Sequence, residues 1–340
     1  MPDLNGYPLG VVPSPPDERD YPYPVYGVMR ATDEMPEDYF GEHFPPVRNQ
    51  GATESCVAQA SMLLRELQER EDIGEDIALS RNAAYHWRFN QYYWQKPGMI
   101  PREHLATLLK TGVPPESFWP GIDERGKQTE PDPLPPLLEA ARPHRIAAYT
   151  AVDGRDIAQM KSAIIERKGV LIGALIHENF APGPDGMIPM PAGVLRGCHM
   201  MAAIYWLRDR WIVPNSWGPQ WGGITLPDGR RIPGYCYLPW GFPLVECWTT
   251  LDRPTELDTE VLLIEGEPRI LINGEWVGPF DRMPFVEQGR FSGVFRHLLT
   301  ALGGEIGDTE GVDWGRYRAG QWAGRMWAKG RLRRPWPRRR

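Results

Sequence analysis

A cysteine, a histidine and an asparagine in this chain each stand inside a short and distinctive string of sequence. Cys56 closes the string PVRNQGATESC, His199 closes GCH, and Asn215 lies in WIVPNSWGPQWG. A thiol becomes an effective nucleophile when it ionises, and an adjacent imidazolium or the positive end of a helix favours the thiolate. These residue types therefore suit covalent attack on a carbonyl group.

The sequence after Ser55 predicts a helix that begins at Cys56. Apolar residues recur there at helical spacing, namely Val57, Ala60, Leu64 and Leu67. Ser55 is a suitable N-cap residue, which puts Cys56 in the first turn.

Together, the three strings resemble those of the papain-like cysteine peptidases. The resemblance implies that His199 is the base that pairs with Cys56, and that Asn215 holds the imidazole in its productive tautomer and orientation. It makes Gln50 the side-chain donor to the oxyanion, together with the backbone N–H of Cys56. In this family the histidine and asparagine follow the cysteine by about 130–150 residues. His199 falls within that range and Asn215 slightly beyond it.

The same resemblance implies that residues next to His199 and Asn215 in the sequence bind the substrate. These are Gly197, Cys198 and Trp217. The implied substrate is a peptide or protein, and the implied reaction is peptide-bond hydrolysis with no cofactor and no metal.

The segment around the thiol departs from the family's usual pattern, Gln-Gly-x-Cys-Gly-Ser-Cys-Trp. Thr53 replaces the first cysteine, Glu54 the glycine and Val57 the tryptophan. Thr53 removes a disulfide partner, and Glu54 raises the thiol pKa by repulsion unless it points to solvent. Two functions are therefore open: an active cysteine peptidase, or a retained fold with weak or no activity that serves as a structural or attachment protein of a phage particle or a cell-surface assembly.

The length of 340 residues and the 41% content of hydrophobic residues allow more than one packed domain. We expect an α+β chain with a two-lobed papain-like fold, a helical lobe plus a β-barrel-like lobe, followed by a small α+β module and a basic tail. The expected divisions are an extended arm at 1–45, the papain-like domain at 46–250, the small module at 257–314 and the tail at 315–340.

Further elements follow from periodicity and from capping residues. Helices are predicted at 80–93, 101–109 and 156–167, with a proline-rich connector at 130–136. Strands are predicted at 169–177, 199–206 and 210–215. The loop 181–196 precedes the base and either lines the cleft or is an ordinary surface loop.

The first 45 residues are rich in Pro, Asp and Tyr and have the composition of an extended arm. Such an arm either packs around the domain, which we favour because the segment is short, or occupies the cleft as a propeptide. The start of the chain has neither a basic stretch nor an apolar core, so no secretory signal is expected. The predicted location is cytoplasmic or virion-associated.

The small module combines β-branched runs at 261–264 and 269–272 with the hairpin signal Asn273-Gly274 and a short helix to Leu302. This order loosely resembles the stalk-like domain named after the N-terminal region of copper amine oxidases. The resemblance implies packing, spacing or attachment, and no copper.

The tail has a charge opposite to that of the rest of the chain. Arg316 to Arg340 holds ten Lys or Arg and no Asp or Glu, although the whole chain has a net charge of −6. Tryptophans interleave with these arginines, which suits an anionic partner such as nucleic acid, an acidic polymer or an acidic protein surface, within a larger assembly. A solvated tail without a partner is the alternative.

The four cysteines show no metal-ligand spacing, so no structural zinc is expected. We expect reduced thiols, with a Cys236–Cys247 bridge as the alternative. No run of apolar residues is long enough for a transmembrane helix.

Overall fold

The computed structural model describes residues 6–17, 20, 22–27, 29–31, 35–74, 76–87, 97–121 and 134–252, and after these only a set of strands. The chain forms two compact units. The first consists of Met1–Tyr23 and Gly27–Arg253, and the second of Pro24–Tyr26 and Pro254–Arg340. Each unit is described by itself.

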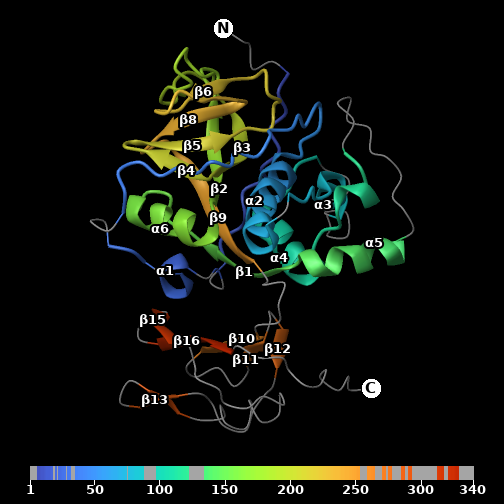
Figure 1. Cartoon of the computed structure of the whole chain (residues 1–340), viewed down its shortest axis with the longest axis vertical. Coiled ribbons are helices and arrows are strands. Elements are labelled where there is room, and N and C mark those ends of the chain that lie inside the picture. Colours follow the sequence, from blue (N-terminus) through green and yellow to red (C-terminus); the bar gives the residue numbers. More distant parts are fainter. Residues whose placement is uncertain are drawn as a thin grey trace. The chain divides into compact units, whose positions relative to one another are not determined.

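The first unit has a helical lobe built around α2 (Cys56–Ile73), which packs against a sheet (Figure 1). The other helices of this unit are α3 (Arg81–His86), α4 (Pro101–Lys110), α5 (Leu134–Ala141) and α6 (Ile157–Arg167), with 3-10 turns at Glu116–Phe118 and Arg142–His144. The short helix α1 (Tyr23–Tyr26) begins in the first unit, and its last three residues are assigned to the second.

Helix α2 begins at the cysteine, as its periodicity predicts. Its apolar face is fully buried, with Met62 and Leu64 at 0% exposure, and each such side chain stabilises the fold by about 1.5–3 kcal/mol. The helix ends at Gly74, which adopts the left-handed conformation that favours glycine and donates its N–H to the carbonyl of Arg70. Ser55 occupies the N-cap position, but its side chain does not cap the helix.

Two predicted segments differ from the structure. The helix expected at 80–93 ends at His86, and residues 88–93 lie outside the described part of the chain. Ser80 caps this helix as expected, because its hydroxyl accepts the Ala83 N–H at 3.0 Å. The proline-rich connector expected at 130–136 overlaps α5, which starts at Leu134, because proline is tolerated in the first turn of a helix.

The second lobe consists of antiparallel sheets. Its strands are β1 (Ile146–Ala151), β2 (Val170–His177), β3 (Leu195–Ala203), β4 (Tyr205–Leu207), β5 (Arg210–Pro214), β6 (Gly223–Thr225), β7 (Arg231–Pro233), β8 (Tyr235–Pro239) and β9 (Leu244–Asp252). They form a four-stranded sheet in the order β1-β9-β2-β3, a three-stranded sheet β4-β5-β8 and the pair β6-β7. Most strands are buried, which explains their nearly continuous apolar sequences.

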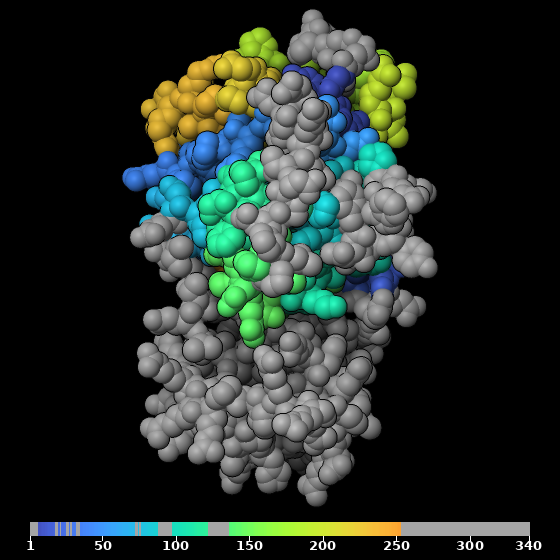
Figure 2. Space-filling model, turned by 90° about the vertical axis from the view of Figure 1, so that its right-hand side faces the viewer, coloured from blue at the N-terminus to red at the C-terminus, as the bar shows by residue number. Residues whose placement is uncertain are grey.

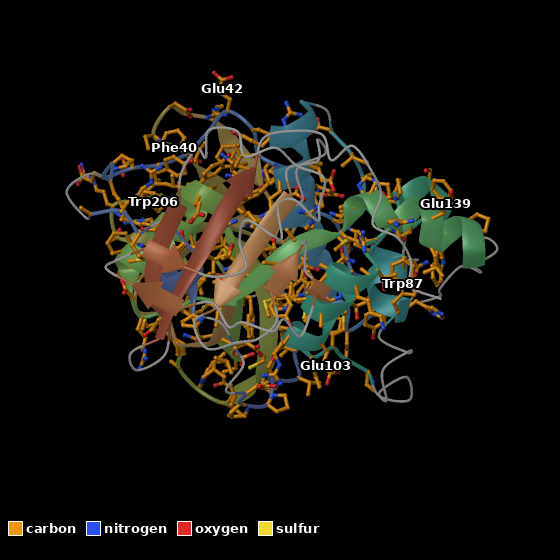
Figure 3. The ribbon with its side chains drawn as sticks, turned by 90° about the horizontal axis from the view of Figure 1, so that it is seen from below. Phe40, Glu42, Trp87, Glu103, Glu139 and Trp206 are labelled. Carbon is orange, nitrogen blue, oxygen red and sulfur yellow. The ribbon has the colours of Figure 1, made fainter. Side chains whose placement is uncertain are left out.

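The first unit has two buried clusters, and the first of them spans both lobes because it includes Met200, Ile212 and Tyr235 of the β lobe. One cluster surrounds α2, and the other lies between α6 and the strands of the β lobe. In Figure 3, Phe40 and Trp206 lie on the side of the β lobe, whereas Trp87 and Glu139 lie on the side of the helical lobe. The arm residue Tyr39 stacks on Trp206 with ring centroids 4.6 Å apart, so this part of the arm packs on the β lobe. The architecture is the expected α+β, two-lobed fold.

The second unit contains a five-stranded antiparallel sheet in the order β12-β11-β10-β16-β15 and a separate hairpin β13-β14. The strands are β10 (Thr259–Ile264), β11 (Ile270–Ile272), β12 (Glu275–Val277), β13 (Phe285–Glu287), β14 (Arg290–Ser292), β15 (Val312–Tyr317) and β16 (Gln321–Ala328). Ile272 pairs with Glu275, which confirms the hairpin predicted from Asn273-Gly274. Strands β15 and β16 include residues from the predicted basic tail, whereas the helix predicted to end at Leu302 lies outside the described residues.

In the described part of the chain, no helix is long and apolar enough to cross a membrane.

Candidate active site

Cys56 is the first residue of α2 and is completely buried. Its sulfur is held by hydrogen bonds from the backbone N–H groups of Met200, Gly10 and Val57. Met200 directly follows His199 on β3, so the thiol lies against the strand that carries the candidate base. Burial raises the pKa of the Cys56 thiol to about 11, and the charge of Glu54 adds to this rise. The expected effect of Glu54 is therefore present but secondary to burial.

His199 and Asn215 form a buried pair. His199 lies within β3, and Asn215 directly follows β5. The Nε2 atom of His199 lies 2.8 Å from Oδ1 of Asn215. Because an amide oxygen only accepts, this contact assigns the proton to Nε2 and leaves Nδ1 unprotonated in the neutral ring. Burial lowers the pKa of His199 to about 4, although its hydrogen bond to Asn215 acts in the opposite direction.

Trp217 covers this pair. Its indole stacks on the His199 imidazole with ring centroids 4.5 Å apart, and Trp221 meets it edge to face. Trp217 is only 3% exposed, so it keeps water from the hydrogen bond between His199 and Asn215.

Gln50 is buried beside the thiol, in the segment that leads to α2. Its Oε1 accepts a 2.5 Å hydrogen bond from the Ser216 hydroxyl, which fixes the orientation of the amide. Its Nε2 donates to the carbonyl of Thr53 at 2.7 Å and to that of Pro8 at 3.2 Å. Ser216 directly follows Asn215 in the sequence, and no motif in the sequence predicts that its hydroxyl holds the Gln50 amide.

Hydroxyl groups hold the segment in which the family usually has a cysteine. The Thr53 hydroxyl donates to the carbonyl of Gln50 at 2.6 Å and lies 2.7 Å from the Ser55 hydroxyl. Gln59 on α2 donates to Ser55 at 3.4 Å. Thr53 thus ties the Gln50 segment to the start of α2 without a covalent bond.

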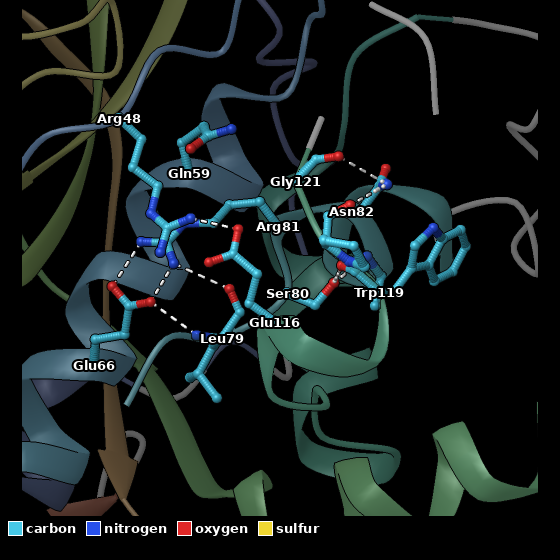
Figure 4. A network of polar contacts seen from close by, with 12 residues as sticks. Arg48, Gln59, Glu66, Leu79, Ser80, Arg81, Asn82, Glu116, Trp119 and Gly121 are labelled. Carbon is cyan, nitrogen blue, oxygen red and sulfur yellow. Dashed lines mark hydrogen bonds and ion pairs between the residues drawn. The ribbon is translucent and has the colours of Figure 1, made fainter. Parts of the chain in front are cut away.

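Ion pairs support this region from the helical lobe (Figure 4). Arg48, two residues before Gln50, pairs with Glu116, and both side chains are half-buried, so this pair ties the Gln50 segment to the 3-10 turn at Glu116–Phe118. The more buried Arg81 of α3 pairs with Glu66 and ties α3 to α2. Breaking one partner of a buried pair generally costs about 3–5 kcal/mol.

The N-terminal arm runs across Trp217, Gln50 and Cys56. Tyr7 stacks on the outer face of Trp217 with ring centroids 4.6 Å apart. The Pro8 carbonyl accepts from Gln50, and the Gly10 N–H reaches the sulfur of Cys56. A Cβ added to Gly10 would lie 2.0 Å from the carbonyl oxygen of Glu54, so only glycine fits this closely against the loop before the thiol.

The arm continues between the two lobes as an extended chain. The N–H of Val11 donates to the carbonyl of Cys198 on the β lobe at 3.3 Å. On the other side, the N–H of Met99 donates to Gly10 at 2.8 Å, and that of Val12 donates to Met99 at 2.9 Å. Figure 2 shows dark blue N-terminal residues between yellow-green segments of the β lobe and cyan segments of the helical lobe.

Arg102, near the start of α4, anchors the next part of the arm. Its guanidinium donates to the carbonyl of Pro15 at 2.7 Å and pairs with Asp20 at 3.0 Å. The arm therefore packs on the domain, as favoured from its length, and it also lies over the candidate site, the position expected under the alternative of a propeptide in the cleft.

The structure thus gathers Gln50, Cys56, His199 and Asn215 in one place. Each residue predicted to bind substrate touches the arm instead: Trp217 contacts Tyr7, Cys198 contacts Val11, and a Cβ at Gly197 would lie 3.1 Å from the Leu9 side chain. Apart from the extended composition of the arm, nothing in the sequence predicts these contacts.

The four cysteines are free and buried, so the alternative of a Cys236–Cys247 bridge is wrong. Within the described residues, no group of acidic, histidine and cysteine side chains is arranged to hold a metal ion.

Comparisons with known proteins agree with this architecture. No family model matches the sequence, and no curated protein matches it. Among solved structures, the chain is similar to xylellain, a cysteine protease from Xylella fastidiosa, with a TM-score of 0.60 and 19% identity over 74% of this chain and 98% of that one. It is also similar to the cysteine protease and lectin-like domains of Cwp84, a surface layer associated protein of Clostridium difficile, with a TM-score of 0.55 and 14% identity over 77% of this chain and 63% of that one.

At these identities the likeness establishes the fold. The chain has the papain-like fold of cysteine proteases.

Proposed function

We propose that this protein is a cysteine peptidase whose N-terminal arm keeps the active site closed. Cys56 is the nucleophile, His199 the base, Asn215 the residue that orients the base, and Gln50 an oxyanion donor. The observation that carries the proposal is the hydrogen bond of 2.8 Å between His199 and Asn215 beneath Trp217, on the strand that meets the thiol at the start of α2.

The reaction follows from these positions. Once the arm has left, solvent and substrate reach Cys56, and His199 takes the proton of the thiol. The thiolate attacks the peptide carbonyl carbon, while the Gln50 amide and the Cys56 N–H stabilise the oxyanion. His199 then protonates the leaving amine, and water attacks the acyl-enzyme with His199 as the base.

The experiment is active-site titration of the full chain with an irreversible thiol-directed epoxide inhibitor of peptidases. Gly10→Ala introduces a steric clash between the arm and the carbonyl oxygen of Glu54, and it deletes no residue. We expect slow labelling of the parent chain, labelling of Cys56 in Gly10→Ala at least about tenfold faster, and none in Cys56→Ser. Gly121→Ala is the matched control, because its added Cβ comes no closer than 3.6 Å to another atom. A folded Gly10→Ala chain whose Cys56 stays unlabelled would overturn the proposal.

The second candidate is a structural or attachment protein with an inactive papain-like fold. It is favoured by the complete burial of Cys56 and His199 and by the substitutions at Thr53, Glu54 and Val57. On this proposal, the basic segment Arg316–Arg340 binds an anionic partner within an assembly, and its deletion abolishes assembly while peptide hydrolysis is absent in every variant.

A further inference from the structure

The hairpin of β15 and β16 in the second unit extends past the neighbouring strand of its sheet. Strand β15 is at the edge of the five-stranded sheet, and β16 lies between β15 and β10. The pairing of β16 with β10 reaches only to Ala323. Beyond this residue, β15 and β16 continue to pair with each other, through Arg316 with Trp322 and Tyr317 with Gln321. These two pairs form what we call the free end of the hairpin.

The character of the sheet changes at the free end. Residues directly opposite one another on neighbouring strands share a face, and the faces alternate along each strand. Arg316 and Trp322 therefore share one face, and Tyr317 and Gln321 share the other. An inner row on the face of Trp322 is entirely apolar, as is typical of a packed sheet, and consists of Val312, Met326, Val261 and Ile272.

The sequence around the free end is cationic. Arg318 stands between the two strands in the sequence, and Arg316 to Arg340 contains ten Lys or Arg and no Asp or Glu. Arg325 differs from the arginines of the free end, because it pairs in register with Asp313 inside the sheet. The free end thus combines positive charge with an indole and a phenol, which is a composition suited to an anionic polymer.

The aromatic residues narrow the kind of anionic polymer. Proteins that bind single-stranded nucleic acid combine cationic side chains along the backbone with aromatic rings on which bases stack. An acidic polypeptide of glutamate offers no base to stack on Trp322 or Tyr317. In a duplex the bases already stack on one another, so their faces are available mainly in single strands. The free end therefore fits a single strand best.

We propose that the free end of the β15–β16 hairpin binds single-stranded nucleic acid, with a base stacked on Trp322 and phosphates held by Arg316 and Arg318. This inference rests on the second candidate function in one respect, because it gives a site and a chemical class to the anionic partner named there. It holds with or without peptidase activity.

The first test measures stacking. Binding of a fluorescently labelled single-stranded DNA of mixed sequence to the full chain is followed by anisotropy at fixed salt. We expect Trp322→Leu to weaken binding about five- to a hundredfold, because it removes the aromatic ring. Trp322→Phe keeps an aromatic face and should remain close to the parent, and circular dichroism checks that both variants fold alike. Equal affinities of the Leu and Phe variants would overturn the inference.

The second test measures the phosphate contacts through salt dependence. For single strands, each neutralised phosphate contributes about 0.7 to the slope of log K against log salt, so Arg316→Gln should reduce the slope by about 0.7. Arg325→Gln is the matched control, because it removes the same charge from the same hairpin at a position opposite Asp313. It should leave the slope unchanged. The same reduction in both variants would contradict a site at the free end.

Competition then distinguishes the classes of partner. Unlabelled single strand should displace the labelled strand at a lower concentration than the duplex of the same sequence or polyglutamate. A duplex or polyglutamate that competes equally well overturns the inference. If deletion of residues 329–340 abolishes binding while Trp322→Leu leaves it unchanged, the inference fails, although the anionic partner of the second candidate function remains.

Discussion

Tyr7 of the arm and Trp217 of the site lie face to face, with ring centroids 4.6 Å apart and an interplanar angle of 17°. The opposite face of Trp217 stacks on His199. One indole therefore connects the position of the arm to the environment of the candidate base.

Tyr7→Ala should loosen the arm and expose Cys56 more often. A stacked aromatic pair contributes about 0.5–1.5 kcal/mol beyond its buried area, which corresponds to an increase of about two- to tenfold in the open population. The rate of Cys56 labelling by a small thiol reagent measures this population. Tyr39→Ala removes a similar stack on Trp206 away from the site, and it should leave the labelling rate unchanged. Equal rates in both variants would contradict the coupling.

The pH dependence of labelling should differ between the closed and open chains. Burial raises the pKa of Cys56 to about 11 when the arm is in place, and the thiolate is the species that reacts. In the parent, labelling should rise with pH up to about 11. In Gly10→Ala, contact with water should move the midpoint down by at least about one unit. If Gly10→Ala is labelled faster but with the same pH profile as the parent, the substitution changes the access of the reagent to Cys56 and leaves the pKa of the thiol unchanged.

The fold should lose stability at acid pH because two buried histidines are held neutral. Burial lowers the pKa of both His199 and His104 from 6.5 to about 4. The unfolded chain therefore binds these protons more readily, so the contribution is fully present above pH 6.5 and is lost as pH falls toward 4. Linkage gives a loss of up to about 3 kcal/mol for each group.

Urea unfolding between pH 4 and pH 8 measures this loss. His104→Gln keeps a partner for Ser61, which lies 2.7 Å from Nε2 of His104, and it should flatten part of the acid dependence. An identical dependence in His104→Gln would exclude His104 as a source.

Ser216 should contribute to catalysis through Gln50. Ser216→Ala leaves the Gln50 amide free to rotate, and we expect kcat in the Gly10→Ala background to fall about tenfold with little change in KM. Gln50→Ala should cost about 10²–10³ in kcat, as for other oxyanion donors. If Ser216 acts only through Gln50, the double variant should be no slower than Gln50→Ala alone, whereas additive losses would show an independent role.

Thr53→Val tests the hydroxyl network that stands in place of the family's disulfide. The change keeps the shape but removes the Thr53 hydroxyl, which donates to the carbonyl of Gln50 at 2.6 Å and lies 2.7 Å from the Ser55 hydroxyl, at a position that is 8% exposed. The Gln50 carbonyl keeps the Thr53 backbone N–H at 3.2 Å. We expect the free energy of unfolding to fall by about 1–3 kcal/mol, with Thr53→Ser close to the parent. Chemical denaturation measures both variants.

The fold could be predicted from the sequence where periodicity and caps agree. Helix α2 starts at Cys56, the Asp156 side chain caps α6 by accepting the Gln159 N–H, and the buried strands β2 and β5 lie where apolar runs predict them. The start of α5 was missed because its prolines suggest a connector, although proline fits the first turn of a helix.

The candidate site could be predicted only where residues carry a local motif. Gln50, Cys56, His199 and Asn215 stand in recognisable strings, and the structure brings them together. The contact of Ser216 with Gln50 and the contacts of the arm depend on which distant segments meet in space. Gly10, for example, carries no sequence signal for its position between Glu54 and Met99.

The register of the arm sets which of its backbone groups meet the candidate catalytic residues. The Gln50 amide donates to the carbonyl of Pro8, and the N–H of Gly10 meets the sulfur of Cys56. On the proposed peptidase function, the arm therefore occupies the oxyanion donor and the nucleophile at the same time, and a substrate carbonyl reaches neither group until the arm detaches.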